Sequence, residues 1–541
     1  MSSRISAAKS TRSGASRTPG AIRSFTISRV RPSPWSTAGA SKMNVTGTLT
    51  LDKLIENSPA KNLFLVFDKY TEEPARITYG EFRNLAKGMA ICLYNDFGVR
   101  KNDRILVRME NCPEYLIVEF ACFYIGALFV PVHHLFRKEE LNGIIASTNL
   151  KIIISDEDTE ISCPSATVIF KKTINEYIYK IKRGSFDKYG YGNGPHFKDP
   201  AILMFSSGTT GEPKGMLFTH EACVYQGAMS RIIYQLSQED IHLVYFPLCH
   251  ASGQAYSVFP AVYSGGAIVL CPKFSASRWI EVVRRHNVTI GNLIFGLTKF
   301  VYAQPREEHD RDNKLRVCFG ESLPEDEVKS FKERFGVELS EGYGLAETLA
   351  RCTHNLPGQR KIGSNGLPGW GVEVEIRDDE KELSLGEVGE IVVRTAKRLK
   401  EYWMEPDLTK ETIKNGWLYT GDLGYFDEGG YLHFVGRRKS IIKRSGENIS
   451  PTEVEKVLKG HPRIEEAVVF GIRDEFRGEV SKAVIIVKDL AEMPVDEIKD
   501  WCVKEMAIFK VPDIIEIVDK IPQTYTGKPD RQKVIECYSK R

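Results

Sequence analysis

A run of hydroxyl-bearing residues and glycines, closed by a lysine, lies between Met204 and His220 (MFSSGTTGEPKGMLFTH). It follows an apolar segment, 201–205, that is typical of a short buried strand. Glycines permit tight turns with bare N–H groups, hydroxyls add donors and a lysine adds a mobile charge, which together suit a polyphosphate. A flexible linker is the alternative, and no Gly-Lys-Ser/Thr supports a Walker A loop. The sequence therefore predicts a phosphate loop formed by Ser206, Ser207, Gly208, Thr209, Thr210, Gly211 and Lys214.

A second candidate segment is 341–348 (EGYGLAET). Its two glycines let the backbone approach a flat ligand, and the ring of Tyr343 can pack on a base. Glu347 can hold a hard cation such as Mg²⁺. Taken alone, the same residues are more typical of a glycine turn at the end of a strand.

Two further segments carry single charged residues beside glycines. Asp422 lies in 419–424 (YTGDLG), where an aspartate is suited to accept both hydroxyls of a ribose, although aspartate turns are common. Lys528 ends 522–528 (PQTYTGK), and a lysine after a glycine turn near a C-terminus is ordinarily a solvated charge. The residues themselves leave both assignments open.

These four segments, in this order, resemble the motifs of the adenylate-forming superfamily, which contains acyl-CoA synthetases, adenylation domains and luciferases. A fifth match is 436–453 (GRRKSIIKRSGENISPTE), which is similar to the family's inter-domain turn except for Ser440, where an aspartate is usual. A pivot needs permissive backbone angles more than a charge, so we expect Ser440 to act as the hinge. The resemblance covers roughly residues 45–541. The segment 250–289 most resembles the carnitine/crotonobetaine-CoA ligase branch.

The resemblance implies a role for each matching residue. It places Gly320, Glu321, Gly342, Tyr343 and Gly344 at the adenine, Asp422 and Arg437 at the ribose, Glu347 on Mg²⁺, Thr348 near the phosphates, Lys528 as the catalytic lysine and Gly446 beside the path of the thiol. It also makes His250, Phe295, Gly296 and Trp370 candidates for lining the acyl pocket. For His250 a buried structural role is nearly as well supported.

The activity implied by the resemblance is that of an AMP-forming acid–thiol ligase. Such an enzyme uses ATP and Mg²⁺ to convert a small carboxylic acid into an acyl-adenylate, then transfers the acyl group to coenzyme A. Three alternatives remain open: an adenylation enzyme that loads a carrier protein, a luciferase-type oxidase, and a non-catalytic nucleotide or acyl binder. The last of these would be expected to lack Lys528, Glu347 or Asp422, and all three are present. Which acid is used is left open.

The elements that must position these residues follow an alternating pattern. A capping box at Thr78–Glu81 begins an amphipathic helix that ends near Gly98, and strand-like segments at 103–107, 128–132 and 151–155 alternate with helices. A second alternating block includes predicted strands at 244–248 and 267–271. The pattern of short β segments and turns in 366–394 is typical of antiparallel or barrel-like strands. We predict an α/β fold, with an N-terminal domain (44–436) of two helix-covered sheets plus a β-barrel and a small mobile α+β domain (437–541).

The N-terminal segment 1–43 differs in composition from the rest of the chain. It holds eight Lys and Arg residues and no acid, so without it the net charge of +3 becomes mildly negative, which gives no case for nucleic-acid binding. We expect this arm to be disordered, and it is either a transit peptide or the result of a start codon placed too early. Eleven scattered cysteines without a C-x-x-C pair favour a reducing compartment. We expect a cytoplasmic protein, or a mitochondrial one if the arm is a transit peptide.

The apolar segment 115–132 could be mistaken for a membrane span. Glu119 lies inside it, however, and Gly126 is a stop signal for a helix. The sequence therefore predicts a buried helix followed by a buried strand, and no transmembrane segment.

Overall fold

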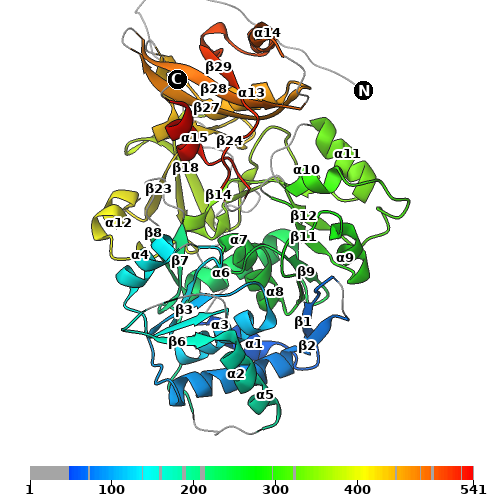
Figure 1. The fold of residues 1–541 in the computed structure, drawn as a ribbon, viewed down its shortest axis with the longest axis vertical. Coiled ribbons are helices and arrows are strands. Elements are labelled where there is room, and N and C mark those ends of the chain that lie inside the picture. Colours follow the sequence, from blue (N-terminus) through cyan, green and yellow to red (C-terminus); the bar gives the residue numbers. More distant parts are fainter. Residues whose placement is uncertain are drawn as a thin grey trace, which may run out of the picture.

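The computed structural model describes most of the chain beyond the N-terminal arm, in the arrangement drawn in Figure 1. The described residues are 48–539 without 71–72, 137, 157–160, 162, 185–189, 207–213, 295–296, 321–324, 357, 445–446, 475–476, 489–492 and 525–526. The expectations for the arm 1–43 thus lie outside the described residues.

The first sheet is parallel at its centre. Its strand order is β21-β8-β7-β4-β3-β5-β6, and β3, β4, β5, β6 and β7 run parallel to their neighbours. The bounds are β3 (Arg104–Arg108), β4 (Leu128–Pro131), β5 (Ile152–Ser155), β6 (Thr167–Phe170), β7 (Pro200–Ser206), β8 (Lys214–Thr219) and β21 (Glu401–Tyr402). The predicted βαβ units and the predicted buried strand before the phosphate loop are confirmed.

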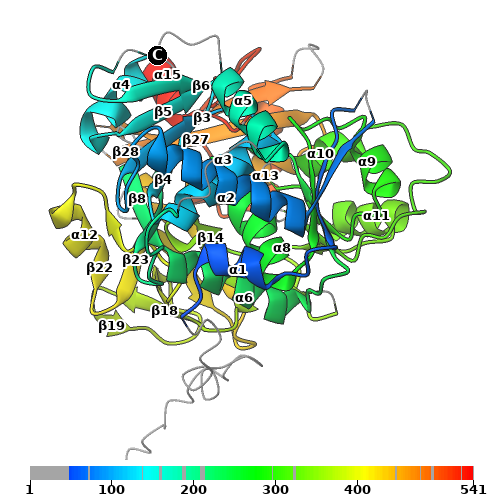
Figure 2. The ribbon, with the colours of Figure 1, turned by 90° about the horizontal axis from the view of Figure 1, so that it is seen from below.

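Helices connect these strands and fill the space between the sheets. The capping box begins α2 (Tyr79–Asn95): the Thr78 side chain accepts from the Glu81 N–H and the Glu81 side chain accepts from the Thr78 N–H. Helix α3 (Pro113–Ile125) ends at Gly126, whose φ of 78° is the left-handed conformation that favours glycine. Figure 2 shows α2 and α3 crossing the middle of the molecule. The shorter α5 (Lys171–Lys182) packs on the same face of the first sheet as these helices, whereas α4 (Lys138–Thr148) covers the opposite face.

The predicted helix and strand in 115–132 are α3 and β4, so that prediction is confirmed. Every residue of α3 from Tyr115 to Ile125 is buried, which explains why the segment is so apolar. Among the described residues no helix combines the length and the apolarity needed to cross a membrane.

The second sheet has the order β13-β12-β11-β9-β10-β1-β2. Its strands are β1 (Leu63–Phe67), β2 (Ala75–Thr78), β9 (Ile241–Val244), β10 (Ala267–Leu270), β11 (Ile290–Asn292), β12 (Val317–Phe319) and β13 (Leu339–Ser340), covered by α9 (Trp279–Arg285) and α11 (Glu325–Phe335) among others.

One predicted strand in this sheet, 244–248, was misplaced. The strand is β9, which ends at Val244, and the residues after it bond to a side chain instead of a neighbouring strand. The Asn111 amide donates to the carbonyl of Phe246 (3.0 Å) and accepts from the N–H of Leu248 (2.9 Å). Because Asn111 satisfies these backbone groups, the chain turns away from the sheet and enters α7 (Ala251–Gly253).

The third sheet is antiparallel and includes strands from the segment 366–394, for which barrel-like strands were predicted. It contains β18 (Val372–Asp378), β19 (Lys381–Glu382), β20 (Gly389–Thr395), β22 (Ile413–Lys414), β23 (Trp417–Phe426) and β24 (Leu432–Arg437). Beyond it lies the small C-terminal domain, orange to red in Figure 1. This domain contains β25 (Ile442–Arg444), β26 (Glu447–Ile449), α13 (Pro451–Lys459), β27 (Ile464–Asp474), β28 (Gly478–Val487), α14 (Val495–Glu505), β29 (Ile514–Ile517) and α15 (Arg531–Tyr538). The predicted fold class is confirmed.

A buried carboxyl group lies in the middle of α3. Glu119 is 0% exposed, and its Oε2 accepts from Gln254 Nε2 (3.0 Å), which also donates to the carbonyl of Leu248 (2.9 Å). Burial raises the pKa of Glu119 to about 8, because the charged form cannot be solvated there. Glu119 is therefore protonated at neutral pH and supports the turn that precedes α7.

We expect Glu119→Gln to stabilise the protein progressively more as the pH rises from 5 to 8. In the unfolded chain Glu119 releases its proton near the ordinary glutamate pKa of 4.5, whereas the folded protein keeps the proton up to about pH 8. In that window the folded state binds more protons, so the wild-type free energy of unfolding falls as pH rises, by about 1.4 kcal/mol per unit for this group. The glutamine does not titrate. Melting temperatures across this range test the effect, with Glu176→Gln on the surface of α5 as the control. Parallel pH profiles of wild type and Glu119→Gln would contradict it.

Candidate active site

The predicted phosphate loop connects two antiparallel strands. Ser206 at the end of β7 pairs with Lys214 at the start of β8, so the two strands form an antiparallel pair. Residues 207–213, which include Ser207, Gly208, Thr209, Thr210 and Gly211, lie outside the described residues. Because β7 runs parallel to β4, Ser206 and Lys214 lie at the carboxyl edge of the parallel strands, where ligands bind in open α/β sheets.

Glu347 lies beside the base of this hairpin. It belongs to the short helix η3 (Ala346–Thr348), and its Oε1 accepts from the hydroxyl of Tyr402 at 3.1 Å. Tyr402 is on β21, which pairs with β8 through the Tyr402–Met216 register. Burial, and next the charge of Glu347, raise the pKa of Tyr402 above its usual range, so this tyrosine remains a donor. The carboxylate is thereby held beside β8, the strand that begins at Lys214.

Tyr343, Asp422 and Arg437 form a second group of contacts. The Tyr343 hydroxyl donates to Asp422 Oδ2 (2.8 Å), and Arg437 Nε lies 3.2 Å from Asp422 Oδ1. Asp422 and Arg437 are direct partners in the β23–β24 hairpin, and this pairing brings their side chains together. Burial raises the pKa of Asp422, and Arg437 opposes that shift. The Tyr343 ring stacks on Phe434 with centroids 6.0 Å apart.

The glycines around Tyr343 are needed for close packing. A Cβ on Gly342 would lie 2.1 Å from the carbonyl oxygen of Thr353, and one on Gly344 would lie 2.3 Å from that of Ala350. Gly320 follows β12, and its N–H donates to the Ser340 carbonyl at 2.9 Å; Glu321 lies outside the described residues.

Thr348 is fully buried inside its own turn. Its hydroxyl donates to the carbonyls of Ala350 (2.9 Å) and Leu345 (3.1 Å). The structure thus gives Thr348 a local role in shaping the turn that carries Glu347, and its predicted place near the phosphates stays a prediction.

Lys528 is presented by a compact turn of the C-terminal domain. The N–H of Thr524 donates to the Lys528 carbonyl (2.7 Å), and Gly527 has a φ of 78° with no atom near its Cβ position. Asp530 then caps α15 by accepting from the Lys533 N–H (3.2 Å). These contacts fix the backbone on both sides of an exposed lysine side chain.

Lys528 lies near enough to His250 of the large domain for its charge to act on the imidazole. Burial, followed by the nearby charge of Lys528, lowers the pKa of His250 to about 4, so the imidazole is neutral at neutral pH. His250 Nδ1 accepts from the Ser252 N–H at 3.1 Å. Because a neutral imidazole has one donor and one acceptor, its proton is then on Nε2, which is a hydrogen-bond donor.

The remaining predicted residues are placed as follows. Trp370 is 8% exposed and stacks on Tyr225 with centroids 5.6 Å apart, inside a core cluster that includes Tyr343. Ser440 ends the short helix η4 (Arg438–Ser440) and is exposed. Phe295, Gly296 and Gly446 lie outside the described residues.

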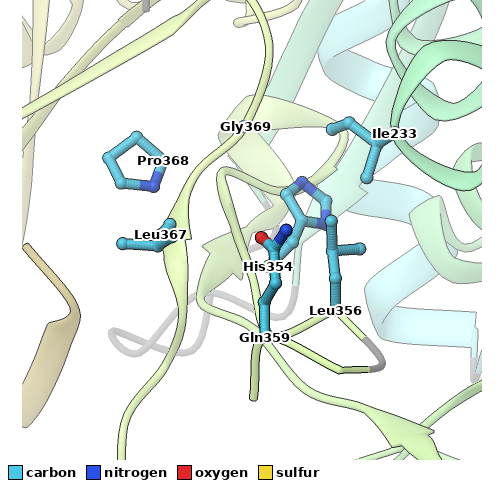
Figure 3. A pocket seen from close by; sticks show the side chains of 7 residues that line it. All are labelled: Ile233, His354, Leu356, Gln359, Leu367, Pro368 and Gly369. Carbon is cyan, nitrogen blue, oxygen red and sulfur yellow. The ribbon is translucent and has the colours of Figure 1, made fainter. Parts of the chain in front are cut away.

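Figure 3 shows the residues that line a small cavity in the large domain. It is lined by Ile233, His354, Leu356, Gln359, Leu367, Pro368 and Gly369, and its volume of about 10 Å³ is near the minimum for one water molecule. His354 Nδ1 is 2.6 Å from the Tyr234 hydroxyl, and the buried Nε2 has no hydrogen-bond partner among the residues that the structure describes. A water bonded to Nε2 fits this cavity, whereas an acyl chain does not.

Comparison with known proteins identifies the family. The family model for the AMP-binding enzyme matches residues 52–403, and that for the AMP-binding enzyme C-terminal domain matches residues 453–528. The chain belongs to the AMP-binding enzyme family. The crotonobetaine/carnitine–CoA ligase of Salmonella agona is 33% identical over 458 residues, which cover 81% of this chain and 89% of that protein.

Solved structures agree with this assignment. The O-succinylbenzoate coenzyme A synthetase of Bacillus subtilis in complex with AMP is 26% identical, with a TM-score of 0.80 over 90% of this chain and 97% of its own. The fatty acyl CoA synthetase of Mycobacterium tuberculosis is 25% identical, with a TM-score of 0.70 over 91% and 98%. The predicted membership of the adenylate-forming superfamily is confirmed, and this AMP-binding enzyme is an AMP-forming ligase.

The groups in the site fit ATP and Mg²⁺. A carboxylate beside a phosphate loop is a suitable magnesium ligand, and Asp422 retains acceptor capacity for hydroxyl groups. Within the described ranges no three or more His, Cys, Asp and Glu side chains form a metal cluster, so Glu347 would share the cation with phosphate oxygens and water.

Sequence reasoning missed two residues of this AMP-binding enzyme that the structure brings to the site. Tyr402 positions Glu347, and Arg351 lies buried beneath the Tyr343 turn. The signal for Tyr402 was weak, because a tyrosine on a short strand is unremarkable. Arg351 could have been noticed as a charge within an otherwise apolar and small-residue segment, 349–352 (LARC).

Proposed function

We propose that this enzyme uses ATP to convert a small carboxylic acid into an acyl-adenylate and then transfers the acyl group to coenzyme A. The observation that carries the proposal is the effect of the Lys528 charge on His250, which indicates that the C-terminal lysine lies near a residue of the large domain. The resemblance of the motifs and the names of the relatives support the same chemistry.

In the first half-reaction, an oxygen of the substrate carboxylate attacks the α-phosphorus of ATP, and the bond from that phosphorus to pyrophosphate breaks. Lys528 would stabilise the charge that moves onto the bridging oxygen, and Nε2–H of His250 would orient the carboxylate. Asp422 would hold the ribose, and Tyr343 would pack at the adenine. Glu347 would hold Mg²⁺, whose charge favours the departure of pyrophosphate.

In the second half-reaction, the thiolate of coenzyme A attacks the acyl carbon, and AMP leaves. We propose that the C-terminal domain, residues 437–541, turns at Ser440, so that Lys528 leaves and the segment around Gly446 approaches. Two arrangements let one pocket serve two transition states.

One contact across the proposed hinge holds the present arrangement. The Ser450 hydroxyl donates to the carbonyl of Val435, and a Cβ on Gly436 would lie only 2.9 Å from that hydroxyl oxygen. Val435 precedes the hinge and Ser450 follows it, so rotation must change this contact.

We expect Ser450→Ala to slow adenylation several-fold while thioester formation keeps its rate. The variant loses the contact that favours the adenylating arrangement, and also a helix cap, because Ser450 accepts from the Glu453 N–H (3.3 Å). Such a cap is worth about 1 kcal/mol. Single-turnover rates of the two half-reactions test the split. Thr219→Ala, which removes a cap at α6 (His220–Tyr234), controls for lost stability. An unchanged ratio of the two rates in Ser450→Ala would show that the hydrogen bond from Ser450 to Val435 does not favour the adenylating arrangement.

The experiment that tests the function is pyrophosphate release from ATP-Mg²⁺ with short, medium, aromatic, hydroxy and carnitine-like acids, with and without coenzyme A. Turnover that requires coenzyme A for one class of acid supports the proposal and names the substrate. A single burst that coenzyme A does not accelerate would indicate a carrier protein as the acceptor. No release with any acid would favour a non-catalytic binder.

We propose a cytoplasmic location for the enzyme. All eleven cysteines are free, as is usual in a reducing compartment. Fluorescent fusions with and without residues 1–43 test this, since mitochondrial import that depends on the arm would identify a transit peptide.

A further inference from the structure

An ion pair with a buried carboxylate lies in the C-terminal domain, close to the turn that carries Lys528. Glu455 on α13 is 5% exposed, and its Oε2 accepts from Nη2 of Arg531, the first residue of α15. Burial raises the pKa of Glu455, and the charge of Arg531 opposes that shift. Because a buried charge is costly without a partner, the Glu455 carboxylate depends on Arg531.

The same two side chains occupy the free edge of β27. Val469 on this strand donates its N–H to Glu455 Oε1 (2.7 Å), and its carbonyl accepts from Arg531 Nη1 (3.1 Å). In the described part of the chain β27 has β28 as its one strand partner, so at Val469 side chains take the place of a second neighbouring strand. The ion pair thus fastens α13 and α15 to one point of the sheet, beside which both helices lie in Figure 1.

A short segment with few free torsions joins Arg531 to Lys528. Only Pro529 and Asp530 separate the two residues, and the proline ring fixes its own φ. The N–H of Asp530 donates to the carbonyl of Pro522 (2.8 Å), at the beginning of the same turn. A displacement of Arg531 therefore moves Lys528 with it.

On its other side the ion pair leads back to the proposed hinge. Glu455 is in the second turn of α13, which begins at Pro451 directly after its cap, Ser450. Ser440 precedes this cap by one short hairpin, β25–β26. The bond from Arg531 to Glu455 spans 76 residues of sequence, and it joins the segment that carries Lys528 to the first helix after the hinge.

We propose that Glu455 and Arg531 are positioning residues of the adenylation step, which hold Lys528 in a fixed orientation relative to the helix that follows the hinge. A rotation at Ser440 then carries the lysine into and out of the site as part of one rigid body. This inference rests on the proposed function. A displacement of about 1 Å caused by a substitution far from the reacting atoms can lower a rate about 100-fold. The pair acts through Lys528, so it matters for adenylation and not for thioester formation.

The test measures both half-reactions in Glu455→Gln and Arg531→Gln. We expect single-turnover adenylation to slow about 10- to 100-fold in each variant, because Lys528 is present but loosely held, while thioester formation from supplied acyl-adenylate keeps its rate. Arg531→Lys keeps the charge but lacks the planar fork that reaches both Glu455 and Val469, and it recovers part of the lost rate.

A double variant distinguishes positioning from general damage. In the Lys528→Ala background, Glu455→Gln should not slow the residual adenylation further, because the group that it positions is already absent. Losses that multiply in the double variant would overturn the proposal. The matched control is Lys459→Gln, which breaks another ion pair between α13 and β27, from Lys459 to Glu466 (3.0 Å), and should leave both rates unchanged.

Amide hydrogen exchange gives a readout that does not depend on turnover. Peptides that contain residues 527–531 should exchange faster in Glu455→Gln than in the wild type and in Lys459→Gln, because the bond to Arg531 no longer holds this segment. Unchanged exchange would overturn the proposal.

Two further results separate this inference from the proposed function. Equal losses of both half-reactions in Glu455→Gln would overturn the positioning role and leave the proposed function intact. Absence of wild-type turnover with every acid would overturn the proposed function, and hydrogen exchange would then still decide whether the ion pair holds the Lys528 segment in place.

Discussion

Replacing Lys528 by alanine abolishes formation of the acyl-adenylate, with a loss of at least about 10²–10³-fold in rate, but spares thioester formation from supplied acyl-adenylate. The lysine approaches His250 from a turn whose backbone is fixed by the Thr524 and Gly527 hydrogen bonds, so its charge is preorganised. Removing one preorganised charge or donor from the transition state has effects of this size. Single-turnover pyrophosphate release measures the first step, and release of AMP from synthetic acyl-adenylate with coenzyme A measures the second.

The matched control for this variant is Lys533→Ala. Lys533 lies on α15 in the same segment and pairs with Asp530 (3.1 Å), with most of its side chain in solvent. We expect Lys533→Ala to leave the rates of both half-reactions unchanged. Equal losses of both half-reactions in Lys528→Ala would refute a specific role in adenylation and would indicate a structural one.

Replacing Asp422 by asparagine raises the KM for ATP by about 10- to 100-fold, with a smaller effect on the KM for the acid. Asp422 accepts from Tyr343 and pairs with Arg437, so the substitution weakens the group that orders both sides of the proposed ribose site. Hydrogen bonds to a charged group contribute about 1.5–3 kcal/mol each, and the asparagine amide must also present donors where only acceptors are wanted. Steady-state kinetics with each substrate varied in turn, together with calorimetric titration of AMP, measure the effect.

Asp427→Asn serves as the control on the same hairpin. Partial burial alone would raise the pKa of Asp427. Hydrogen bonds from Lys361 and His433 outweigh that effect and hold the pKa at about 2, well below its usual value. The group is charged at neutral pH, and its favourable contribution is lost only as the pH falls toward 2. Asp427→Asn should therefore lower the melting temperature without changing the KM for ATP. A comparable rise of that KM in both variants would mean that ATP binding depends on the intact hairpin and not on the Asp422 carboxylate itself.

Local signals in the sequence were sufficient for several elements. The capping box of Thr78 and Glu81 marked the start of α2, and Gly126 marked the end of α3, because these signals act between residues a few positions apart. The apolar strand before the phosphate loop was likewise evident from its composition. The order of the five motifs indicated the family, whereas composition alone would have left Lys528 as a solvated charge.

Other features depended on contacts between distant segments. Tyr343 bonds to Asp422 across 79 residues, Lys528 reaches His250 from another domain, and the partners of Arg351 come from β12, β13 and the π-helix η2 (Gln254–Val258). The misplaced strand at 244–248 has the same origin, because the side chain of Asn111 took the backbone hydrogen bonds that a neighbouring strand would have supplied. The sequence by itself determined most of the elements and the type of chemistry, since the signals for helices, strands and each motif lie among residues that are neighbours along the chain. Only the tertiary structure decided which charges are buried and what faces them, because burial and charge pairing depend on segments that meet only when the sheets pack.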